Sequence, residues 1–272
     1  MLRHVPSQPL DAFIACLWYS DTHTPGRRRE FALPSGRADV VFNLLDEPIR
    51  TFASPEDTVG WSTRDAVVHG PQSRSFVLDD RKRTRVVGVH FLPAGVVLLG
   101  VPPKDLRDRH VALESLWGLR ARTLREELIE AGEPAAMFAI LEREFLWRLQ
   151  RPVLVHPAVS FALRRFDSTA TATPVAAVRE QTGYGERRFA TLFSDAVGLT
   201  PKSYARVQRL CQAAAELARG DRPLADIAAD AGYYDQAHLN RDFRELIGIT
   251  PGSYEPMAGR STLHTQVPPE ER

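Results

Sequence analysis

The 272-residue sequence predicts an α+β protein with a strand-rich N-terminal half and an all-helical C-terminal half. Three observations support this division. Short runs of β-branched and aromatic residues, separated by glycine, proline and aspartate, fill the first 112 residues. Apolar residues then recur at helical spacing as far as residue 150. Beyond residue 156, a stretch of 30 or 31 residues occurs twice.

Four strands are predicted in the N-terminal half, at 13–19, 39–44, 75–78 and 85–91. Their short lengths and the turn residues between them are typical of a small barrel or a sandwich. The segment 33–39 is predicted to be a turn that leads into the second of these strands. We expect a small β-barrel.

The pattern becomes helical from residue 94. A short apolar piece at 94–99 precedes two amphipathic helices, 113–131 and 134–150. The second helix has an apolar seam at positions i, i+3, i+7 and i+11, formed by Phe138, Leu141, Phe145 and Leu149. Such a seam can cover the barrel or pair two subunits. We predict a homodimer through residues 113–150.

The chain is expected to form two domains. Residues 1–150 form the first and residues 158–260 the second. The linker between them is placed at 151–157, because its prolines restrict helix on either side. The last segment, 261–272, is polar and is predicted to be disordered.

The repeated stretch occupies residues 175–204 and 224–254. In each copy a short apolar helix meets a glycine, Gly183 or Gly232, where a residue with positive φ can end it. A tight turn and a second helix follow, and a Thr-Pro pair begins the next element. Helix, tight turn and helix form the helix-turn-helix layout, in which the second helix enters a DNA major groove.

Specific motifs then point to a family. The A-x-x-x-G-Y turn, the Q-A-H-L-N-R-D-F run and the G-I-T-P-G-S-Y ending resemble the DNA-binding domain of AraC-type (AraC/XylS family) transcriptional regulators, over the stretch from His156 to Tyr254. The N-terminal half more loosely resembles the cupin-like sensor domains attached to many of these regulators. The resemblance implies a DNA-binding regulator that is not an enzyme, with a sensor domain that binds an effector and commonly dimerises.

Helical spacing selects the residues that face DNA. With Leu239 and Phe243 directed inward, Arg241 lies on the opposite face of its helix. Arginine pairs with guanine, and glutamine or asparagine with adenine. The family correspondence also points to Gln236 and Arg241. The residues expected at DNA are Arg187, Arg188, Ala190, Thr191, Gln236, Ala237, His238, Asn240, Arg241 and Arg244 on the second helices of the two copies, and Arg206 and Arg209 on the helix between them.

The first copy departs from the family pattern. Family members often place arginine or lysine where Thr191 stands and a polar residue where Ala190 stands, which leaves Arg187 as its main long side chain for base readout. Net charge adds little to DNA affinity, because residues 156–260 hold 13 lysines and arginines against 12 aspartates and glutamates. Binding therefore depends on a local basic face, and we expect modest affinity for non-specific DNA.

A small-molecule cavity is a second expectation. Six polar or aromatic residues on or beside predicted strands could line it, namely Trp18, Arg37, Asp39, Trp61, His69 and His90. His69 and His90 lack the His-x-His pair and glutamate of a metal-binding cupin, so no metal and no cofactor is predicted. The sequence does not identify the effector, and a regulator that responds to a protein partner instead is an alternative.

Composition excludes other classes. Cys16 and Cys211 are isolated, which argues against a disulfide framework and a cysteine zinc site and fits a cytoplasmic protein. No apolar run approaches 18 residues and no signal-peptide core is present, so no membrane partner is expected. A rival reading is a DNA-tethered enzyme of the alkyl-acceptor repair type, which needs an activated cysteine nucleophile. The operator sequence, and whether the output is activation or repression, do not follow from the sequence.

Overall fold

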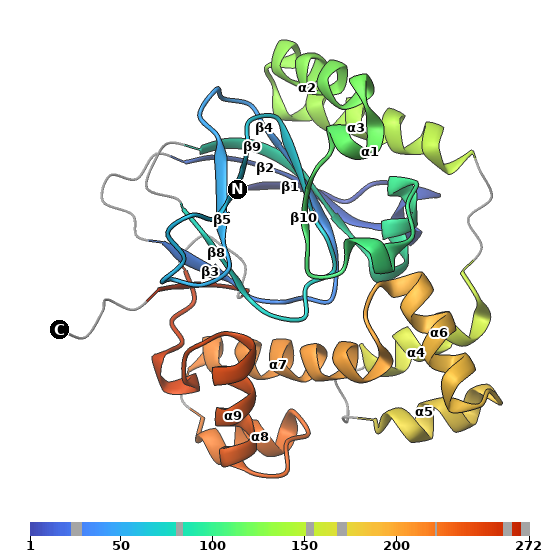
Figure 1. Cartoon of the computed structure of the whole chain (residues 1–272), viewed down its shortest axis with the longest axis vertical. Coiled ribbons are helices and arrows are strands. Elements are labelled where there is room, and N and C mark those ends of the chain that lie inside the picture. The colour runs from blue at the N-terminus through green and yellow to red at the C-terminus, as the bar shows by residue number, and fades with distance from the viewer. Residues whose placement is uncertain are drawn as a thin grey trace.

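Two antiparallel β-sheets are built from residues 2–112 and one strand of the C-terminal tail, and helices form most of the chain between them (Figure 1). The computed structural model describes residues 1–22, 29–79, 84–150, 155–167, 173–220, 222–257 and 263–267. The mixed fold class and the order of strands before helices agree with the sequence analysis.

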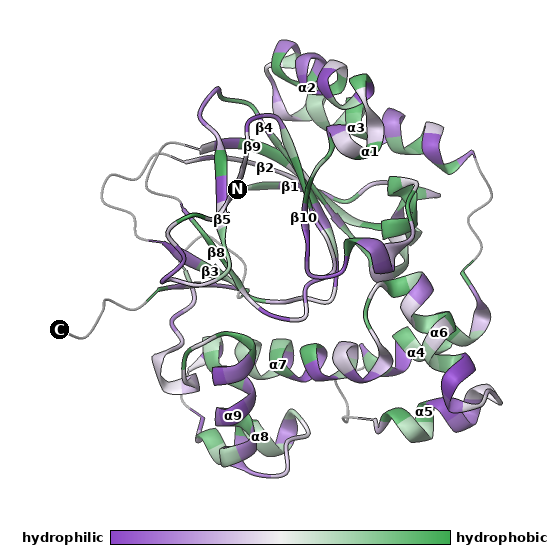
Figure 2. Ribbon diagram, viewed as in Figure 1, coloured by the Kyte–Doolittle hydropathy of each residue, from purple (hydrophilic) through white to green (hydrophobic). Residues whose placement is uncertain are grey.

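The first sheet has the strand order β1-β2-β9-β4-β7-β10. In that order its strands are Leu2–His4, Ile14–Thr22, Thr84–Phe91, Asp39–Asn43, Ala66–His69 and His110–Ala112. Strands β2, β4 and β9 correspond to the predicted strands 13–19, 39–44 and 85–91, and hydrophobic residues run along them (Figure 2). Because side chains alternate along a strand, one face carries Leu17, Val40 and Val87 into the core beneath the helices. The opposite face is turned toward the second sheet.

The second sheet has the order β11-β3-β8-β5-β6. Its strands are His264–Gln266, Glu30–Ala32, Phe76–Leu78, Ile49–Phe52 and Trp61–Thr63. The predicted strand 75–78 is β8. The described residues form two separate sheets, and closure of these sheets into a barrel stays a prediction.

The C-terminal tail corrects one expectation. Residues 261–272 were expected to be disordered, but 264–266 form strand β11 at the edge of the second sheet. Thr265 is fully buried. Its hydroxyl accepts a hydrogen bond from the backbone N–H of Glu255 and donates one to the backbone carbonyl of the same residue. The ring of His264 lies 3.1 Å from a carboxylate oxygen of Glu30, which is itself buried. Residues 261–262 and 268–272 lie outside the described residues.

Three helices cover the first sheet. They are α1 (Glu114–Trp117), α2 (Leu119–Ala131) and α3 (Pro134–Leu149). The predicted helix 113–131 is broken at Gly118, which has φ of +56°. The apolar piece at 94–99 forms the 3-10 helix η2 (Pro93–Leu99), and η1 (Leu10–Ala12) and η3 (Pro103–Leu106) are two further short turns.

The apolar seam of α3 is the second correction. Phe138, Leu141 and Phe145 are buried within the protein's own core, and Leu149 packs against it. The ring of Phe145 contacts that of Phe91 on β9, at a centroid distance of 5.4 Å. The seam therefore covers the sheet, and the predicted homodimer loses the surface on which it was based.

The C-terminal helices follow the predicted order. They are α4 (Pro157–Phe166), α5 (Val175–Thr182), α6 (Glu186–Val197), α7 (Pro201–Arg219), α8 (Leu224–Asp230) and α9 (Gln236–Leu246), and η4 (Pro251–Ser253) ends the series. The long helix α7 runs beneath the sheets, with α4 to α6 near one end and α8 and α9 near the other (Figure 1). Most of the predicted linker, residues 151–154, lies outside the described residues.

Candidate nucleic-acid interface and ligand cavity

The first repeated unit is the pair α5–α6. Helix α5 ends at Gly183 in the left-handed region, at φ of +73°, as the sequence predicts. Phe189, Phe193 and Val197 are the buried residues of α6. The outward face holds Arg187, Arg188 and Thr191, all exposed, and Ala190 at half burial.

The second unit is the pair α8–α9. Here Gly232 has φ of +77°, and Asp235 caps α9 by accepting a hydrogen bond from the backbone N–H of His238 at 2.7 Å. Leu239, Phe243 and Leu246 are buried, as their spacing predicts. The exposed residues of the predicted DNA face are Gln236, Ala237, Arg241 and Arg244, and His238 and Asn240 are half-buried.

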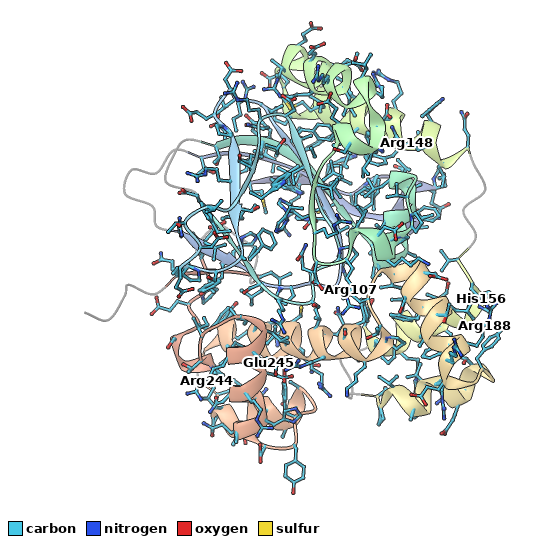
Figure 3. All side chains as sticks on the ribbon, in the orientation of Figure 1. Arg107, Arg148, His156, Arg188, Arg244 and Glu245 are labelled. Atoms are coloured by element: carbon cyan, nitrogen blue, oxygen red, sulfur yellow. The ribbon has the colours of Figure 1, made fainter. Side chains whose placement is uncertain are left out.

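Four arginines give these two faces their charge. Arg187 and Arg188 on α6, and Arg241 and Arg244 on α9, form no side-chain ion pair with any described residue. Figure 3 labels Arg188 and Arg244 at opposite ends of the C-terminal region. The charge of Arg241 also acts on Glu245, without an ion pair. Exposed guanidinium groups that contact no carboxylate are suited to phosphate oxygens and guanine edges.

Two other predicted DNA residues are engaged within the protein. Arg206 on α7 bonds the carboxylates of Asp242 and Glu245 on α9, with N–O distances of 2.7 and 2.6 Å. Arg209 lies over the ring of Tyr233, 5.4 Å from its centroid. Both side chains connect α7 to the second pair, and their positions favour fixing that pair over contacting phosphate.

Helix α7 sets the separation of the two pairs. Its 19 residues span about 28 Å at 1.5 Å per residue. One turn of B-DNA separates successive major grooves by about 34–36 Å. With the bodies of the pairs added at either end, α6 and α9 can lie in successive grooves.

One exposed aromatic residue was not predicted. Tyr234, in the turn before α9, is 93% exposed, whereas its neighbour Tyr233 is 5% exposed. The Gly-Tyr-Tyr sequence contained the signal, because the repeat shares only one of its two tyrosines. Tyr234 lies two residues before Gln236, in the turn that leads into α9.

The two pairs differ in what holds them. The first pair packs in a core of its own with α4 and with Tyr204 of α7. The second shares a core with the second sheet, including Phe31, Phe52 and Val77. Ser75 also bonds the end of α9, with its N–H donating to Leu246 at 2.7 Å and its hydroxyl to Ile247 at 3.0 Å.

A cavity of about 1040 Å³ is lined by residues of both sheets. Five of the six predicted ligand residues line it, namely Trp18, Arg37, Asp39, His69 and His90. Trp61 does not line it and instead packs with Trp18, Val41, Val67 and Val86. The tail also takes part, through Leu263 and His264, and sequence reasoning missed both because it placed them in a disordered segment.

A polar row crosses the cavity face of the first sheet. Cys16, His90, Asp39, His69 and His110 occupy paired positions on neighbouring strands. His90 bonds Asp39 through its Nδ1, and His69 and His110 share a hydrogen bond of 2.7 Å between their Nδ1 atoms. Residues at paired positions of neighbouring strands point to the same face of the sheet, so the register of these strands brings the five side chains together.

Burial sets the charge of this row. It lowers the pKa of His69 to about 3 and that of His110 to about 4, so both rings are neutral near pH 7. Burial acts to raise the pKa of Asp39, but the charge and the hydrogen bond of His90 outweigh it, and the pKa lies below its ordinary value. The Asp39 carboxylate is therefore ionised and already engaged.

Neither cysteine is activated. Burial raises the pKa of the Cys16 thiol, and it raises the pKa of Cys211 to about 12. Cys211 donates a hydrogen bond to the carbonyl of Pro34 at 3.3 Å. In the described ranges, no group of three or more His, Cys, Asp or Glu side chains is arranged to hold a metal ion. The helices of the described chain include none with the length and apolar character needed to cross a membrane.

Comparison with known proteins follows this division of the chain. Residues 178–256 match a helix-turn-helix domain model, and residues 2–112 match a domain of unknown function (DUF6597). The regulatory protein SoxS of Escherichia coli strain K12 is 36% identical over 77 residues, which are 28% of this chain and 72% of SoxS. This chain belongs to the AraC family of transcriptional regulators.

Other members of the AraC family show more distant similarity. The HTH-type transcriptional activator RhaR of Klebsiella pneumoniae is 29% identical over 142 residues, 52% of this chain and 45% of RhaR. Among solved structures, ToxT of Vibrio cholerae strain SCE256 covers 86% of this chain and 92% of its own, at 9% identity and a TM-score of 0.47. The C-terminal domain of AraT from Geobacillus stearothermophilus covers 36% of this chain and 83% of its own, at 19% identity and a TM-score of 0.34.

Proposed function

We propose that this AraC-family member is a sequence-specific DNA-binding regulator that uses α6 and α9 as the recognition helices of two helix-turn-helix motifs. One observation carries the proposal. Both helices, related by an internal repeat, expose unpaired arginines on the face opposite their buried phenylalanines. A solvated helix face gains little from such a concentration of cations, whereas a DNA groove gains much.

The residues divide by role. Arg187, Gln236 and Arg241 lie toward the N-terminal and central parts of their helices, where recognition helices contact base edges, and we assign base readout to them. Arg188 and Arg244 are assigned to phosphates, with Thr191, Ala190, Ala237, His238 and Asn240 completing the two surfaces. Arg206 and Arg209 are positioning residues that hold the second pair on α7.

The N-terminal half, residues 1–150, is proposed as the sensor domain, and 158–260 as the DNA-binding domain. The cavity supports this proposal, because its 1040 Å³ is of the size that takes a small molecule. Its position between the sheets places it next to the core that the second sheet shares with α8 and α9. Occupancy of the cavity would thereby influence how α9 is presented to DNA.

A homodimer through 113–150 stays a proposal and would need a different face from the buried seam. The exposed apolar residues on α2 and α3 are Leu119, Ile129, Leu146 and Trp147. The alkyl-acceptor enzyme is disfavoured, because a cysteine nucleophile needs a lowered pKa and both thiols have raised ones.

The test is selection of bound fragments from random duplex DNA by the full chain, followed by affinity measurements on the preferred duplex. Arg241→Ala should weaken binding to that duplex by about 1–3 kcal/mol and less on a random duplex. Arg64→Ala, which removes an exposed arginine between β6 and β7, outside residues 113–150, is the charge-matched control and should change the affinity for neither duplex. Recovery of no preferred sequence would refute the proposal.

A further inference from the structure

Arg37 is a cavity arginine whose guanidinium forms no ion pair or hydrogen bond with the described residues. It is half-buried, in the loop between β3 and β4. The charge of the Asp167 carboxylate acts on Arg37 without an ion pair, so the guanidinium lacks the direct contacts that normally offset its desolvation. The site is therefore incomplete as it stands.

A second donor in the same cavity is also unsatisfied. The indole of Trp18 is 7% exposed, and its Nε1 has no hydrogen-bond partner. The ring is held in place by stacking on His90 at a centroid distance of 5.4 Å, and by Gly88, where an added Cβ would come within 2.5 Å of the indole. A buried N–H without an acceptor is uncommon. Neighbouring atoms cover the Trp18 Nε1, so a ligand acceptor would reach it only after a small shift of the side chains around the ring.

The other charges around the cavity are already matched. Asp39 is bonded by His90, and Glu47 and Asp79 each have a partner in the fold. Arg50 lies over the ring of Phe52 and donates to the carbonyl of Val59, and Arg3 is exposed at the rim. The unmatched groups inside are thus donors, and one of them is a full positive charge.

We infer that the cavity binds a small molecule with an anionic group, such as a carboxylate or sulfonate, which Arg37 pairs and to which the Trp18 indole donates. Apolar residues such as Val41, Val86 and Leu78 line much of the cavity, and polar ones such as Asn43, Ser62 and Gln72 lie among them. The remainder of the ligand is therefore largely apolar or aromatic. This inference rests on the proposed sensor function and specifies its ligand class.

The loop that carries Arg37 gives the anion a route to the DNA-binding half. Leu33, Ser35 and Arg37 line the cavity, while the backbone between them bonds α7. The carbonyl of Ser35 accepts from Gln208 Nε2 at 2.9 Å, and that of Pro34 accepts from Cys211.

Gly36 brings the loop against α7. It has φ of +71°, and a Cβ placed there would lie 2.9 Å from the ring of Tyr204, so only glycine fits this contact. Tyr204 in turn donates to Asp167 at 2.6 Å. Burial raises the pKa of the Asp167 carboxyl above its ordinary value, and the hydrogen bond of Tyr204 and the charge of Arg37 act against that rise. An anion that draws Arg37 into the cavity would weaken its attraction to Asp167 and shift the loop on α7.

A matched pair of fluorescent dyes tests the anion site. Anilinonaphthalene sulfonate (ANS) and N-phenylnaphthylamine (NPN) share one aromatic body, and only ANS carries a negative charge. We expect ANS to bind the full-length protein more tightly than NPN. Arg37→Gln should weaken the binding of ANS by about tenfold, while the affinity for NPN should stay within about twofold of the wild-type value. Arg50→Gln, which removes a cavity arginine that already has partners, should leave both dyes within about twofold.

Trp18→Phe keeps the aromatic packing and removes the N–H donor, so it tests the same site even if Arg37→Gln fails to fold. It should also weaken the binding of ANS more than the binding of NPN. Equal affinity for the two dyes in the wild type would overturn the inference. An ANS preference that survives both Arg37→Gln and Trp18→Phe would also overturn it, because the anion would then be held elsewhere.

The coupling is tested on the duplex recovered by selection. Saturating ANS should change the affinity of the wild type for that duplex, and saturating NPN should change it less. Arg37→Gln should abolish the difference between the dyes. If no preferred duplex exists, the regulator proposal fails while the dye titrations still decide the anion site. An ANS effect on DNA that is the same in Arg37→Gln would contradict the route through the loop.

Discussion

The two helix pairs come from one repeated sequence, yet the protein stabilises them differently. The pair α5–α6 is completed by helices, with Val159 and Phe166 of α4 and Tyr204 of α7 in its core. The pair α8–α9 is completed by a β-sheet, through Phe31 and Phe52. Helix α6 contacts the N-terminal half mainly through η2 and η3, where Lys104 pairs with Asp195 at 2.8 Å in an exposed contact. A duplicated module can thus present two similar exposed helix faces while only one of its copies shares a core with the second sheet.

The largest expected difference comes from the equivalent phenylalanines Phe193 and Phe243. Both are fully buried, and truncation to alanine should cost about 3–5 kcal/mol in either case. Phe243→Ala should raise amide hydrogen exchange in β3 and β8 as well as in α8 and α9. Phe193→Ala should raise it in α4 to α6 and leave the second sheet protected. Identical hydrogen-exchange maps for the two variants would show that the two pairs do not differ in how they are coupled to the second sheet.

Among the substitutions, the next largest loss of stability is expected from breaking the ion pairs between Arg206 on α7 and the carboxylates of Asp242 and Glu245 on α9. Arg206→Gln should destabilise the second pair by about 2 kcal/mol, because it leaves the buried carboxylate of Asp242 without its cation. The first pair has no corresponding bridge among the described residues. Chemical denaturation followed by exchange at α9 measures the loss. An Arg206→Gln variant that keeps full stability but loses DNA affinity would reassign Arg206 to phosphate contact.

Lowering the pH should destabilise the sheets and the second helix pair more than the first pair. The folded protein keeps His69 and His110 neutral, with pKa values of about 3 and about 4, whereas the unfolded chain protonates them below about pH 6.5. The unfolded state then binds more protons, so stability is full above pH 6.5 and falls as the pH drops toward 4. We expect the sheets and the second pair to lose roughly 3–4 kcal/mol of stability between pH 7 and pH 5, about half of it from each ring. His110→Gln should reduce this slope, and an unchanged slope would show that other groups cause it.

The smallest expected effects lie at the helix caps. Asp235 caps α9, whereas Gly185 at the start of α6 offers no side chain. Asp235→Ala should cost about 1 kcal/mol. Gly185→Ser should raise the free energy of unfolding by roughly a few tenths of a kcal/mol. The position accepts a side chain, because Gly185 has φ of −65° and an added Cβ meets no atom within 4 Å. Thermal melts of the two variants beside the wild type measure both. A loss on Gly185→Ser would mean that the serine does not cap α6.

Local patterns predicted most of the helical half. The seven-residue spacing from Leu239 to Leu246, and the glycines that end α5 and α8, depend only on neighbours in the chain, and all agree with the structure. The longer strands β2, β4 and β9 were found for the same reason. Most strands of three or four residues, such as β1 and β6, carry too short an alternation to be detected, and the three-residue strand β8 is the exception.

What failed depends on distant partners. The polar tail became a strand because β3 offered a free edge and Glu30 and Glu255 offered partners, and none of these contacts is visible in the tail's own sequence. The seam of Phe138 and Phe145 was correctly placed on one helix face, but a stripe does not specify whether it packs within the chain or against another copy. The cavity residues were found where strand alternation places them, as for Asp39 and His90, and Trp61 was not among them.

The most direct test of the central claim maps base preference position by position on the duplex recovered by selection. Wild type, Arg187→Ala and Arg241→Ala would each be titrated against duplexes changed at single base pairs. If α6 and α9 contact DNA in successive major grooves, each variant relaxes preference at one position, and the two positions lie about 10 base pairs apart. Relaxation at the same position for both variants, or unchanged preference in both, would contradict readout by two recognition helices.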